Sequence, residues 1–407
     1  MRVSYLVLIR RTAWTCTVGL LGVSSCQDAL PGLPRLGTPS QSTYVPTKAL
    51  ECEADSAPAL VFDTILISGS GQFPVASPDD GGASVIAFRG RGSHVSIDGR
   101  LDFAVLDPTD HLLRRLSPSE LDSPLDDRNP AFIALSSSEW LLLYAEVDPG
   151  GPNGSFDIGR ARYRLRFSRT TDGGMTWLTP STPVLPGVDT ALASPYGKMR
   201  RLADGTVLAT IYDSQDSMSN YYSWRPRLLA TRDSGRTWSV EGTLPWVHSE
   251  TAFLPVGGDT VIAAMRSGPN WIEGTISPDL GRNWTPPVKV TEVNQVPGDL
   301  AELPNGELLL IFGDRTAYPK GIWYKRLMRI GLEFSASGVG FAVPVGTQGI
   351  DFGYPSVVRV LPDGRVRFVY YVSGSDVPGT TQLRYAEFCP RLSPLQGGAY
   401  QPLSRKP

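Results

Sequence analysis

The octapeptide TTDGGMTW at residues 170–177 recurs twice more in this 407-residue chain, as TRDSGRTW at 231–238 and as SPDLGRNW at 277–284. Each copy holds a hydroxyl residue, an Asp two positions later, a Gly two after that, and a Trp three beyond the Gly. The Asp can accept hydrogen bonds from backbone N–H groups, the Gly permits a positive φ, and the Trp can pack beneath the turn. The chain is therefore predicted to contain an internal repeat of compact hairpin turns.

A second repeat is a hairpin pattern, in which an apolar stretch enters a tight polar turn and returns as another apolar stretch. The six turns are Asp80-Gly81-Gly82, Ser137-Ser138-Glu139, Asp204-Gly205, Gly257-Gly258-Asp259, Asn305-Gly306 and Asp363-Gly364. Asp-Gly and Asn-Gly between alternating apolar runs are strong short-range hairpin signals. Six hairpins without a sustained helical period predict an all-β fold, a six-bladed β-propeller of four-stranded antiparallel blades over residues 59–390. The stretch 64–67 is predicted either to precede the first hairpin or to complete the last blade as a closing strand.

The N-terminus has the pattern of a targeting segment. Three arginines precede an apolar run over residues 12–23 that is shorter than an ordinary transmembrane span. Residues 1–25 are predicted as a signal peptide, and the sequence VSSC ending at Cys26 resembles a bacterial lipobox, whose Cys is acylated. The alternative is an ordinary secretory signal cleaved after small residues. Both predict export, to a lipid-anchored site in a bacterial cell envelope in the first case and to the periplasm or medium in the second.

The segments 26–58 and 391–407 flank the predicted propeller as a tether and a C-terminal tail. The tether is rich in Pro, Ser, Thr and Gly, which is typical of a flexible connection. Cys52 and Cys389 lie at the two ends of the predicted ring. In an oxidising compartment they could form a disulfide that closes it, or stay as two thiols, because sequence alone does not supply their geometry.

Composition limits the classes of partner. The formal net charge of -2 gives no electrostatic argument for nucleic acid or for a membrane surface, so membrane contact is expected only through the N-terminal anchor. The three histidines show no metal-ligand spacing, and we expect neither a metal nor a cofactor. We expect a monomer.

The hairpin pattern also nominates one face of the ring. In a hairpin, the start of the first strand and the end of the second lie together, opposite the turn. The residues at those positions are Arg89; Arg128 with Glu146; Tyr196 and Lys198 with Asp213; Glu250 with Arg266; Asp299 with Arg315; and Tyr354 with Tyr371. Charged and aromatic residues recur at these positions, so they are predicted to converge in a binding or catalytic site.

The three octapeptides resemble the Asp box of the sialidase and BNR-repeat superfamily, whose members are six-bladed β-propellers. The resemblance covers most of residues 62–388 and implies a structural role for Asp172, Asp233 and Asp279, because the boxes of that family lie away from its active face. It further implies a retaining exo-glycosidase that removes terminal sialic or related nonulosonic acids from glycoconjugates. In that family three arginines bind the sugar carboxylate, a Tyr assisted by a Glu is the nucleophile, and an Asp is the acid/base.

Four residues match these roles by their local sequence and their order. Glu250 opens ETAFLPVGGDTVIAAMR, which is similar to the segment that begins with the assisting Glu and ends with the second arginine, here Arg266. Arg315 in GDRTAYPKG resembles the third arginine, and Tyr354 in GYPSVVRVLPDG resembles the nucleophile. A neutral phenol suits an anionic sugar because a carboxylate nucleophile would be repelled. Glu250 as base and the nearby guanidiniums would favour the developing phenolate.

The first arginine and the acid/base each have two candidates. Arg128 in RNPAF resembles the Arg-Ile-Pro strand of the family, and Arg89 in AFRGRGSHVSIDGR competes with it. We favour Arg128, with Arg89 as a rim contact and Asp299 as a further substrate-facing residue. Asp157 lies in a Gly-containing loop near the place expected for the acid/base, and Asp148 is its rival.

Each match has a structural alternative. Glu250 and Arg266 could form an ion pair that only stabilises one hairpin, Tyr354 could pack at the channel mouth, and Arg315 could pair with Asp299. At the level of the whole protein, the alternatives are a propeller that binds a glycan or protein without turnover, or another glycoside-processing enzyme on the same fold. An enzyme predicts that the catalytic residues share one pocket on which the arginines converge.

Overall fold

The computed structural model describes Cys52 and residues 59–92, 97–157, 159–268, 270–316, 320–330, 333–344, 351–374 and 380–390. These residues belong to one compact unit that begins at Leu50. The predicted signal peptide, Cys26, the tail and the predicted tether apart from Cys52 lie outside the described residues.

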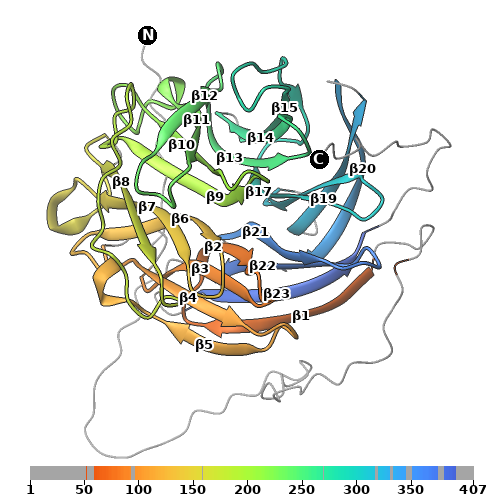
Figure 1. The fold of residues 1–407 in the computed structure, drawn as a ribbon, viewed down its shortest axis with the longest axis horizontal. Helices are drawn as coiled ribbons and strands as arrows, with labels where there is room; N and C mark the ends of the chain where they lie inside the picture. Colours follow the sequence, from red (N-terminus) through yellow and green to blue (C-terminus); the bar gives the residue numbers. More distant parts are fainter. Residues whose placement is uncertain are drawn as a thin grey trace, which may run out of the picture. The chain divides into compact units, whose positions relative to one another are not determined.

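Antiparallel β-sheet forms nearly all of the regular structure (Figure 1). Four sheets have four strands each. They are β2 (Gln72–Pro78), β3 (Ser84–Gly90), β4 (Arg100–Leu106) and β5 (Leu112–Leu116); β13 (His248–Pro255), β14 (Val261–Ser267), β15 (Ile272–Ser277) and β16 (Val288–Lys289); β17 (Gln295–Glu302), β18 (Leu308–Asp314), β19 (Gly321–Ile330) and β20 (Glu333–Pro344); and β1 (Ala59–Ser68), β23 (Gln382–Cys389), β22 (Val366–Ser373) and β21 (Asp351–Val360).

A further sheet has seven strands. It combines β6 (Asp126–Ala134), β7 (Trp140–Asp148) and β8 (Arg162–Thr170) with β9 (Ala193–Arg201), β10 (Val207–Asp213), β11 (Arg225–Thr231) and β12 (Ser239–Thr243). The two groups join through a short parallel pairing of β6 with β9. The helices of the described residues are three short 3-10 turns, η1 (Ser119–Leu121), η2 (Pro152–Gly154) and η3 (Tyr221–Ser223). Among these residues no helix is long and apolar enough to cross a membrane.

The sheets follow one another around a centre in a propeller-like arrangement (Figure 1). Their first strands, β2, β6, β9, β13, β17 and β21, contact one another in that order, and β21 contacts β2. The all-β prediction is confirmed, but the prediction of six separate four-stranded blades is not, because the described residues form four such sheets and one sheet of seven strands. The difference arises because β8 has no full fourth strand beside it and because β6 hydrogen-bonds to β9.

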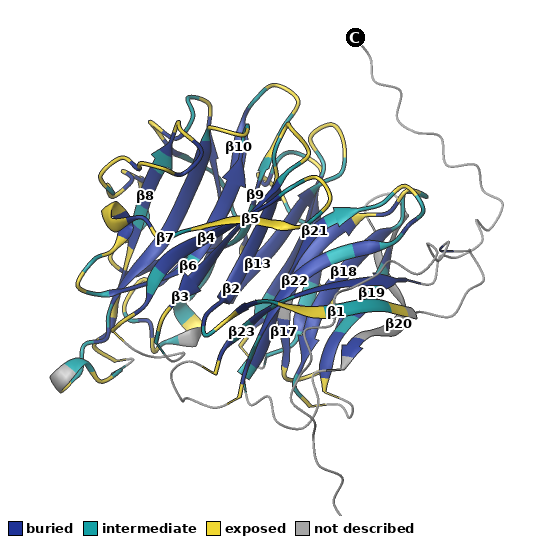
Figure 2. Ribbon diagram, turned by 90° about the horizontal axis from the view of Figure 1, so that it is seen from below, coloured by how far each residue is buried: buried dark blue, intermediate teal, exposed yellow. Residues whose placement is uncertain are grey.

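The six predicted hairpins are confirmed by the strand pairing. Each predicted turn joins the first and second strands of a group, as Asp204-Gly205 does between β9 and β10. Gly205 has a φ of 88°, which permits the tight return. The second strands are buried along most or all of their length, as in β3, β10 and β18, because they lie between sheet neighbours with other sheets on both faces (Figure 2).

The three repeated octapeptides form turns after β8, β11 and β15, and all three share one hydrogen-bond pattern. In the first turn, Asp172 Oδ1 accepts from the Thr176 backbone N–H at 2.9 Å, and the Gly174 N–H donates to Thr170 Oγ1 at 3.1 Å. Trp177 is buried beneath the turn and stacks on Phe103, with ring centroids 4.9 Å apart. These turns follow third strands, so they lie at the end of the sheets opposite the predicted site.

The ring closes between the two ends of the described chain. Strand β1 pairs antiparallel with β23, from Ala59 opposite Cys389 to Ser68 opposite Gln382. The stretch 64–67 therefore belongs to a closing strand, which decides between the two positions that the sequence left open. Beside this pairing, Cys52 is bonded to Cys389, with Cα atoms 5.6 Å apart.

Candidate active site

Strand bulges direct several side chains toward the centre of the ring. The pairing of β2, β6 and β21 with their neighbours each shifts register by an extra residue. At these shifts Phe73, Asn129 and Tyr354 have positive φ angles of 52°, 52° and 51°, and a proline follows each of them. Such conformations are uncommon for residues other than glycine and persist where the surroundings hold them. All three residues line the same cavity.

This cavity has a volume of about 450 Å³. Its charged lining residues are Arg128, Glu250 and Arg266, and its aromatic ones are Phe73, Phe156, Tyr163, Tyr212, Trp224 and Tyr354. They come from β2, β6, β8, β10, β13, β14 and β21 and from loops between strands. A pocket that combines aromatic side chains with a few convergent charged groups is typical of a small-molecule site.

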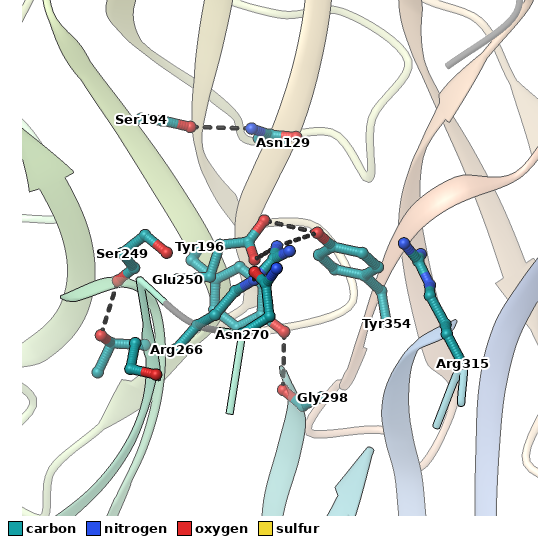
Figure 3. A network of polar contacts seen from close by, with 12 residues as sticks. Asn129, Ser194, Tyr196, Ser249, Glu250, Arg266, Asn270, Gly298, Arg315 and Tyr354 are labelled. Carbon is teal, nitrogen blue, oxygen red and sulfur yellow. Dashed lines mark hydrogen bonds and ion pairs between the residues drawn. The ribbon is translucent and has the colours of Figure 1, made fainter. Parts of the chain in front are cut away.

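Tyr354, Glu250 and Arg266 form a hydrogen-bonded triangle (Figure 3). The Tyr354 hydroxyl donates to Glu250 Oε1 at 2.7 Å. Arg266 Nη1 donates to Glu250 Oε2 at 2.6 Å and to the Tyr354 hydroxyl oxygen at 3.2 Å, while its Nε donates to Asn270 Oδ1 at 3.1 Å. The phenol therefore has a carboxylate positioned to accept its proton and a fixed positive charge beside its oxygen.

The protonation state of Tyr354 follows from these neighbours. Burial and the adjacent Glu250 carboxylate raise the pKa of Tyr354, and Arg266 and Arg315 offset part of the rise. The resting form is thus a neutral phenol that donates to Glu250. If the proton moves to Glu250, the carboxylate charge that opposes phenolate disappears, and the guanidiniums remain to stabilise the phenolate.

Arg128 presents an incompletely bonded guanidinium to the cavity. The residue is only 5% exposed, and its Nη1 donates to Asp126 Oδ2 at 3.3 Å. Its Nε has no hydrogen-bond partner among the described residues. Burial lowers the pKa of Arg128, but Asp126 and nearby tyrosines outweigh that effect and raise it. A guanidinium that lines a cavity and makes one long hydrogen bond to a carboxylate is suited to bind an anion there.

Arg315 lies on the other side of the Tyr354 ring from Glu250 (Figure 3). Its Nε and Nη2 donate to the Phe352 carbonyl at 2.9 and 2.7 Å, and Nη2 also donates to Asp351 Oδ1 at 2.8 Å. It is not among the residues that line the 450 Å³ cavity, although its side chain is 27% exposed. Tyr354 contributes to raising the pKa of Arg128, of Arg266 and of Arg315, and Arg266 is the one of the three with a described hydrogen bond to its hydroxyl.

Two predicted substrate-facing residues are buried in ion pairs. Arg89 is 0% exposed, and its Nε donates to Asp126 Oδ1 at 2.7 Å, so it cannot be a rim contact. Asp299 is bonded to Lys198 at 2.5 Å and to Arg200 at 2.9 Å rather than to Arg315. Asp299 lines a smaller cavity together with Tyr196 and Lys198. The charged residues that line the larger cavity do not line this smaller one. Both residues pair with charges on strands of other sheets.

The acid/base candidates lie near the cavity but do not line it. Asp157 has a 44% exposed side chain, which ion-pairs with Arg160 at 3.6 Å. Its neighbour Phe156 lines the cavity, so the loop reaches the site. Asp148 at the end of β7 accepts from the Gly150 N–H at 3.0 Å. Neither carboxylate contacts Tyr354 or Glu250 in the described hydrogen bonds.

Several lining residues escaped the sequence reasoning. Tyr163 is the second residue of β8, Trp224 directly precedes β11, and Asn270 lies in the loop after β14. The sequence rule considered only the first two strands of each hairpin, whereas these residues sit at the start of third strands or in the loop before them. Extending the same rule to the loop between second and third strands would have found them, because it lies at the same end of the sheet.

Comparisons with known proteins agree with this architecture. Residues 115–367 match the model of the BNR repeat-like domain family, and the chain therefore belongs to that family. This confirms the predicted resemblance of the chain to the BNR-repeat superfamily. No curated protein matches the sequence.

Solved structures with a similar fold are sialidases. A Hadza microbial sialidase is 14% identical, with a TM-score of 0.55, and the match covers 82% of this chain and 67% of the other. The Trypanosoma rangeli sialidase in complex with the inhibitor DANA is 14% identical, with a TM-score of 0.56 over 79% of this chain and 55% of that one. The K499G mutant of the NanB sialidase from Streptococcus pneumoniae is 11% identical, with a TM-score of 0.57, and the match covers 79% of this chain and 68% of that one. At these identities the likeness is one of fold, and the match spans little more than half of the trypanosomal enzyme.

Proposed function

We propose that this protein is a sialidase-like exo-glycosidase that hydrolyses terminal sialic or related nonulosonic acids with retention of configuration. The observation that supports it most is the hydrogen bond of 2.7 Å from the Tyr354 hydroxyl to Glu250, in a cavity that also holds Arg128 and Arg266. A buried phenol bonded to a carboxylate and flanked by guanidiniums is an activated nucleophile suited to an anionic sugar.

In the proposed reaction, Arg128, Arg266 and Arg315 bind the sugar carboxylate. The Tyr354 oxygen attacks the anomeric carbon as its proton passes to Glu250, and the bond to the aglycone oxygen breaks while Asp157 supplies a proton to that oxygen. Water then attacks the same carbon, Asp157 takes its proton, and Tyr354 leaves and recovers the proton from Glu250. Two displacements at one carbon give net retention.

The proposal extends to architecture and location. If the seven-stranded sheet is counted as two blades joined at β6 and β9, the closed series of first strands supports a six-bladed propeller. We further propose an exported monomer anchored through an acylated Cys26, acting on sialylated or related acidic glycans. The sequence of the first 26 residues supports the export and anchoring.

Hydrolysis of a fluorogenic aryl sialoside tests the nucleophile and its base. Tyr354→Phe keeps the ring that packs edge-on against Phe73, so it should fold yet abolish turnover. Glu250→Gln should lower kcat by about 10²–10⁴-fold. Tyr196→Phe is the matched control, because Tyr196 is buried in the same hydrophobic core cluster as Tyr354. Its hydroxyl donates to the Gly298 carbonyl at 3.0 Å instead of to Glu250, so this substitution should leave kcat unchanged. Activity in folded Tyr354→Phe would refute the proposed nucleophile.

The acid/base assignment has a separate test. An activated aryl leaving group needs little protonation, whereas the alkoxide of a natural glycan needs a proton donor. Asp157→Ala should therefore reduce kcat on a sialylated oligosaccharide far more than on the aryl sialoside. Asp148→Ala is the comparison, and a selective loss in that variant instead would transfer the role to Asp148.

A glycan-binding propeller without turnover is the second candidate. The observation that favours it is the position of Asp157 and Asp148 outside the lining of the cavity. A binding module predicts that free sialic acid binds to the folded protein while neither the aryl sialoside nor sialylated oligosaccharides are hydrolysed. Calorimetry beside the activity assay separates the two functions.

A further inference from the structure

Behind Arg128, a second arginine holds the carboxylate that Arg128 contacts. Arg89 on β3 donates from Nε to Asp126 Oδ1 at 2.7 Å, and Arg128 donates from Nη1 to the other oxygen of Asp126 at 3.3 Å. Arg89 Nη1 also donates to Gln72 Oε1 at 2.5 Å and to the Arg91 carbonyl at 3.1 Å. Two buried guanidiniums from adjacent sheets therefore share the Asp126 carboxylate.

The two distances show that Asp126 is bonded more tightly to Arg89 than to Arg128. The shorter bond belongs to Arg89, which has no exposed surface, while Arg128 keeps a single long bond and an unfilled Nε. A carboxylate free of Arg89 could turn both oxygens toward Arg128 and form a two-bond ion pair, the strongest arrangement for these groups. In a buried site such a pair would cancel much of the attraction of Arg128 for another anion.

The site is also tightly packed around this contact. A side chain at Gly99 would place its Cβ 1.8 Å from Asp126 Oδ1 and 2.4 Å from Arg89 Nε. The Asp127 N–H donates to the Gly99 carbonyl at 3.0 Å, which holds this backbone against the ion pair. Asp126 thus has little freedom to move while Arg89 is in place.

We propose that Arg89 is a positioning residue, which binds Asp126 and so keeps Arg128 available for the carboxylate of the substrate. This inference rests on the proposed function, in which Arg128 binds the sugar carboxylate. Arg89 then affects substrate affinity without touching the substrate. This role also explains why a buried arginine lies next to Arg128, which lines the cavity.

Kinetics and ligand binding of Arg89 variants test the proposal. Arg89→Met should raise KM for the aryl sialoside, and the Kd of the inhibitor DANA by calorimetry, about 10-fold or more, with kcat changed less than about threefold. Arg89→Lys should recover part of the affinity, because it restores the positive charge beside Asp126. Arg384→Met is the matched control, since Arg384 pairs with Asp63 through two nitrogens on the outer part of the last sheet and should not change KM.

A double-mutant cycle tests whether the effect of Arg89→Met is transmitted through Asp126, and Arg89→Lys takes its place in the cycle where Arg89→Met folds poorly. In an Asp126→Asn background the carboxylate that could neutralise Arg128 is gone, so adding Arg89→Met should change KM little. Equal KM increases from Arg89→Met in both backgrounds would overturn the proposal, as would an unchanged KM in the folded single variant. A wild-type protein that neither hydrolyses sialosides nor binds DANA would defeat the proposed function, and this inference with it. Active wild-type protein with an insensitive Arg89→Met would defeat only the inference.

Discussion

Asp127 is a fully buried carboxyl group whose titration should couple pH to stability. Burial raises its pKa from 3.8 to about 7, with Glu146 and Asp126 adding to the rise and hydrogen bonds from Ser123 opposing it. The folded state therefore retains a proton that the unfolded chain loses above about pH 4. The stability from this group is fully present below pH 4 and is lost as pH rises through 7.

This linkage predicts that Asp127→Asn, which does not titrate, will weaken the pH dependence of thermal unfolding. Between pH 5 and pH 8 the melting temperature of the wild-type protein should fall more than that of the variant. Calorimetry at both pH values measures the difference. Parallel pH profiles for the two proteins would show that Asp127 is already ionised in the folded state at pH 5.

At the scale of single residues, position on the hairpins was enough to find Glu250, Arg266, Arg128 and Tyr354, which share one cavity. The same rule predicted that Arg89 lies on the rim of the site, but the structure buries this residue completely. The reason is that a residue at a strand end faces either the ligand or a neighbouring sheet, and the deciding partner, here Asp126, comes from another hairpin. Sequence alone does not contain that contact.

At the scale of elements, the repeated turns should be stability features with little effect on the site. Gly174 in the first turn has a φ of 84°, and a Cβ there would lie 2.3 Å from the ring of Trp140. Gly174→Ala should lower the free energy of unfolding by about 2–4 kcal/mol through backbone strain and overpacking. Gly187→Ala is the control, because Gly187 has a similar φ of 75° with no atoms near its Cβ, and it should cost only about 1 kcal/mol.

Chemical denaturation measures the free energy of unfolding of both glycine variants, and a fluorogenic sialoside assay checks that the proposed activity is unchanged. Equal destabilisation by the two substitutions would mean that the turn does not pack as tightly as the structure shows. The turns themselves were predictable, since the Asp-Gly signals and the octapeptides specify local geometry. The bulges at Phe73, Asn129 and Tyr354 were not, because a one-residue shift depends on the pairing of two strands.

At the scale of the whole molecule, stability should depend on the closure between β1 and β23. The disulfide from Cys52 to Cys389 links positions 337 residues apart beside this pairing. Cys52→Ser with Cys389→Ser should lower the free energy of unfolding by about 2–5 kcal/mol while leaving kcat at 25 °C unchanged, because the cavity is formed elsewhere. Thermal unfolding with and without reductant measures this loss of stability. An oxidised wild-type protein that is no more stable than the variant would contradict a stabilising role for the disulfide.

The ring itself was predictable from six hairpins, but its division into sheets was not. Hydrogen bonding between β6 and β9 joins two groups of strands, and this depends on how closely neighbouring inner strands approach. Closure by β1 was one of two positions that the sequence allowed. Long-range pairing of this kind is set by the assembled fold rather than by any local pattern.

Covalent trapping tests the central claim most directly. The Trypanosoma rangeli sialidase has been solved as a covalent intermediate with 2,3-difluorosialic acid. Incubation of this protein with that compound, followed by intact-mass and peptide mass spectrometry, should show one sugar adduct on the peptide that contains Tyr354 and none in folded Tyr354→Phe. An adduct on another residue, or no adduct in an active wild-type protein, would contradict a mechanism in which Tyr354 is the nucleophile.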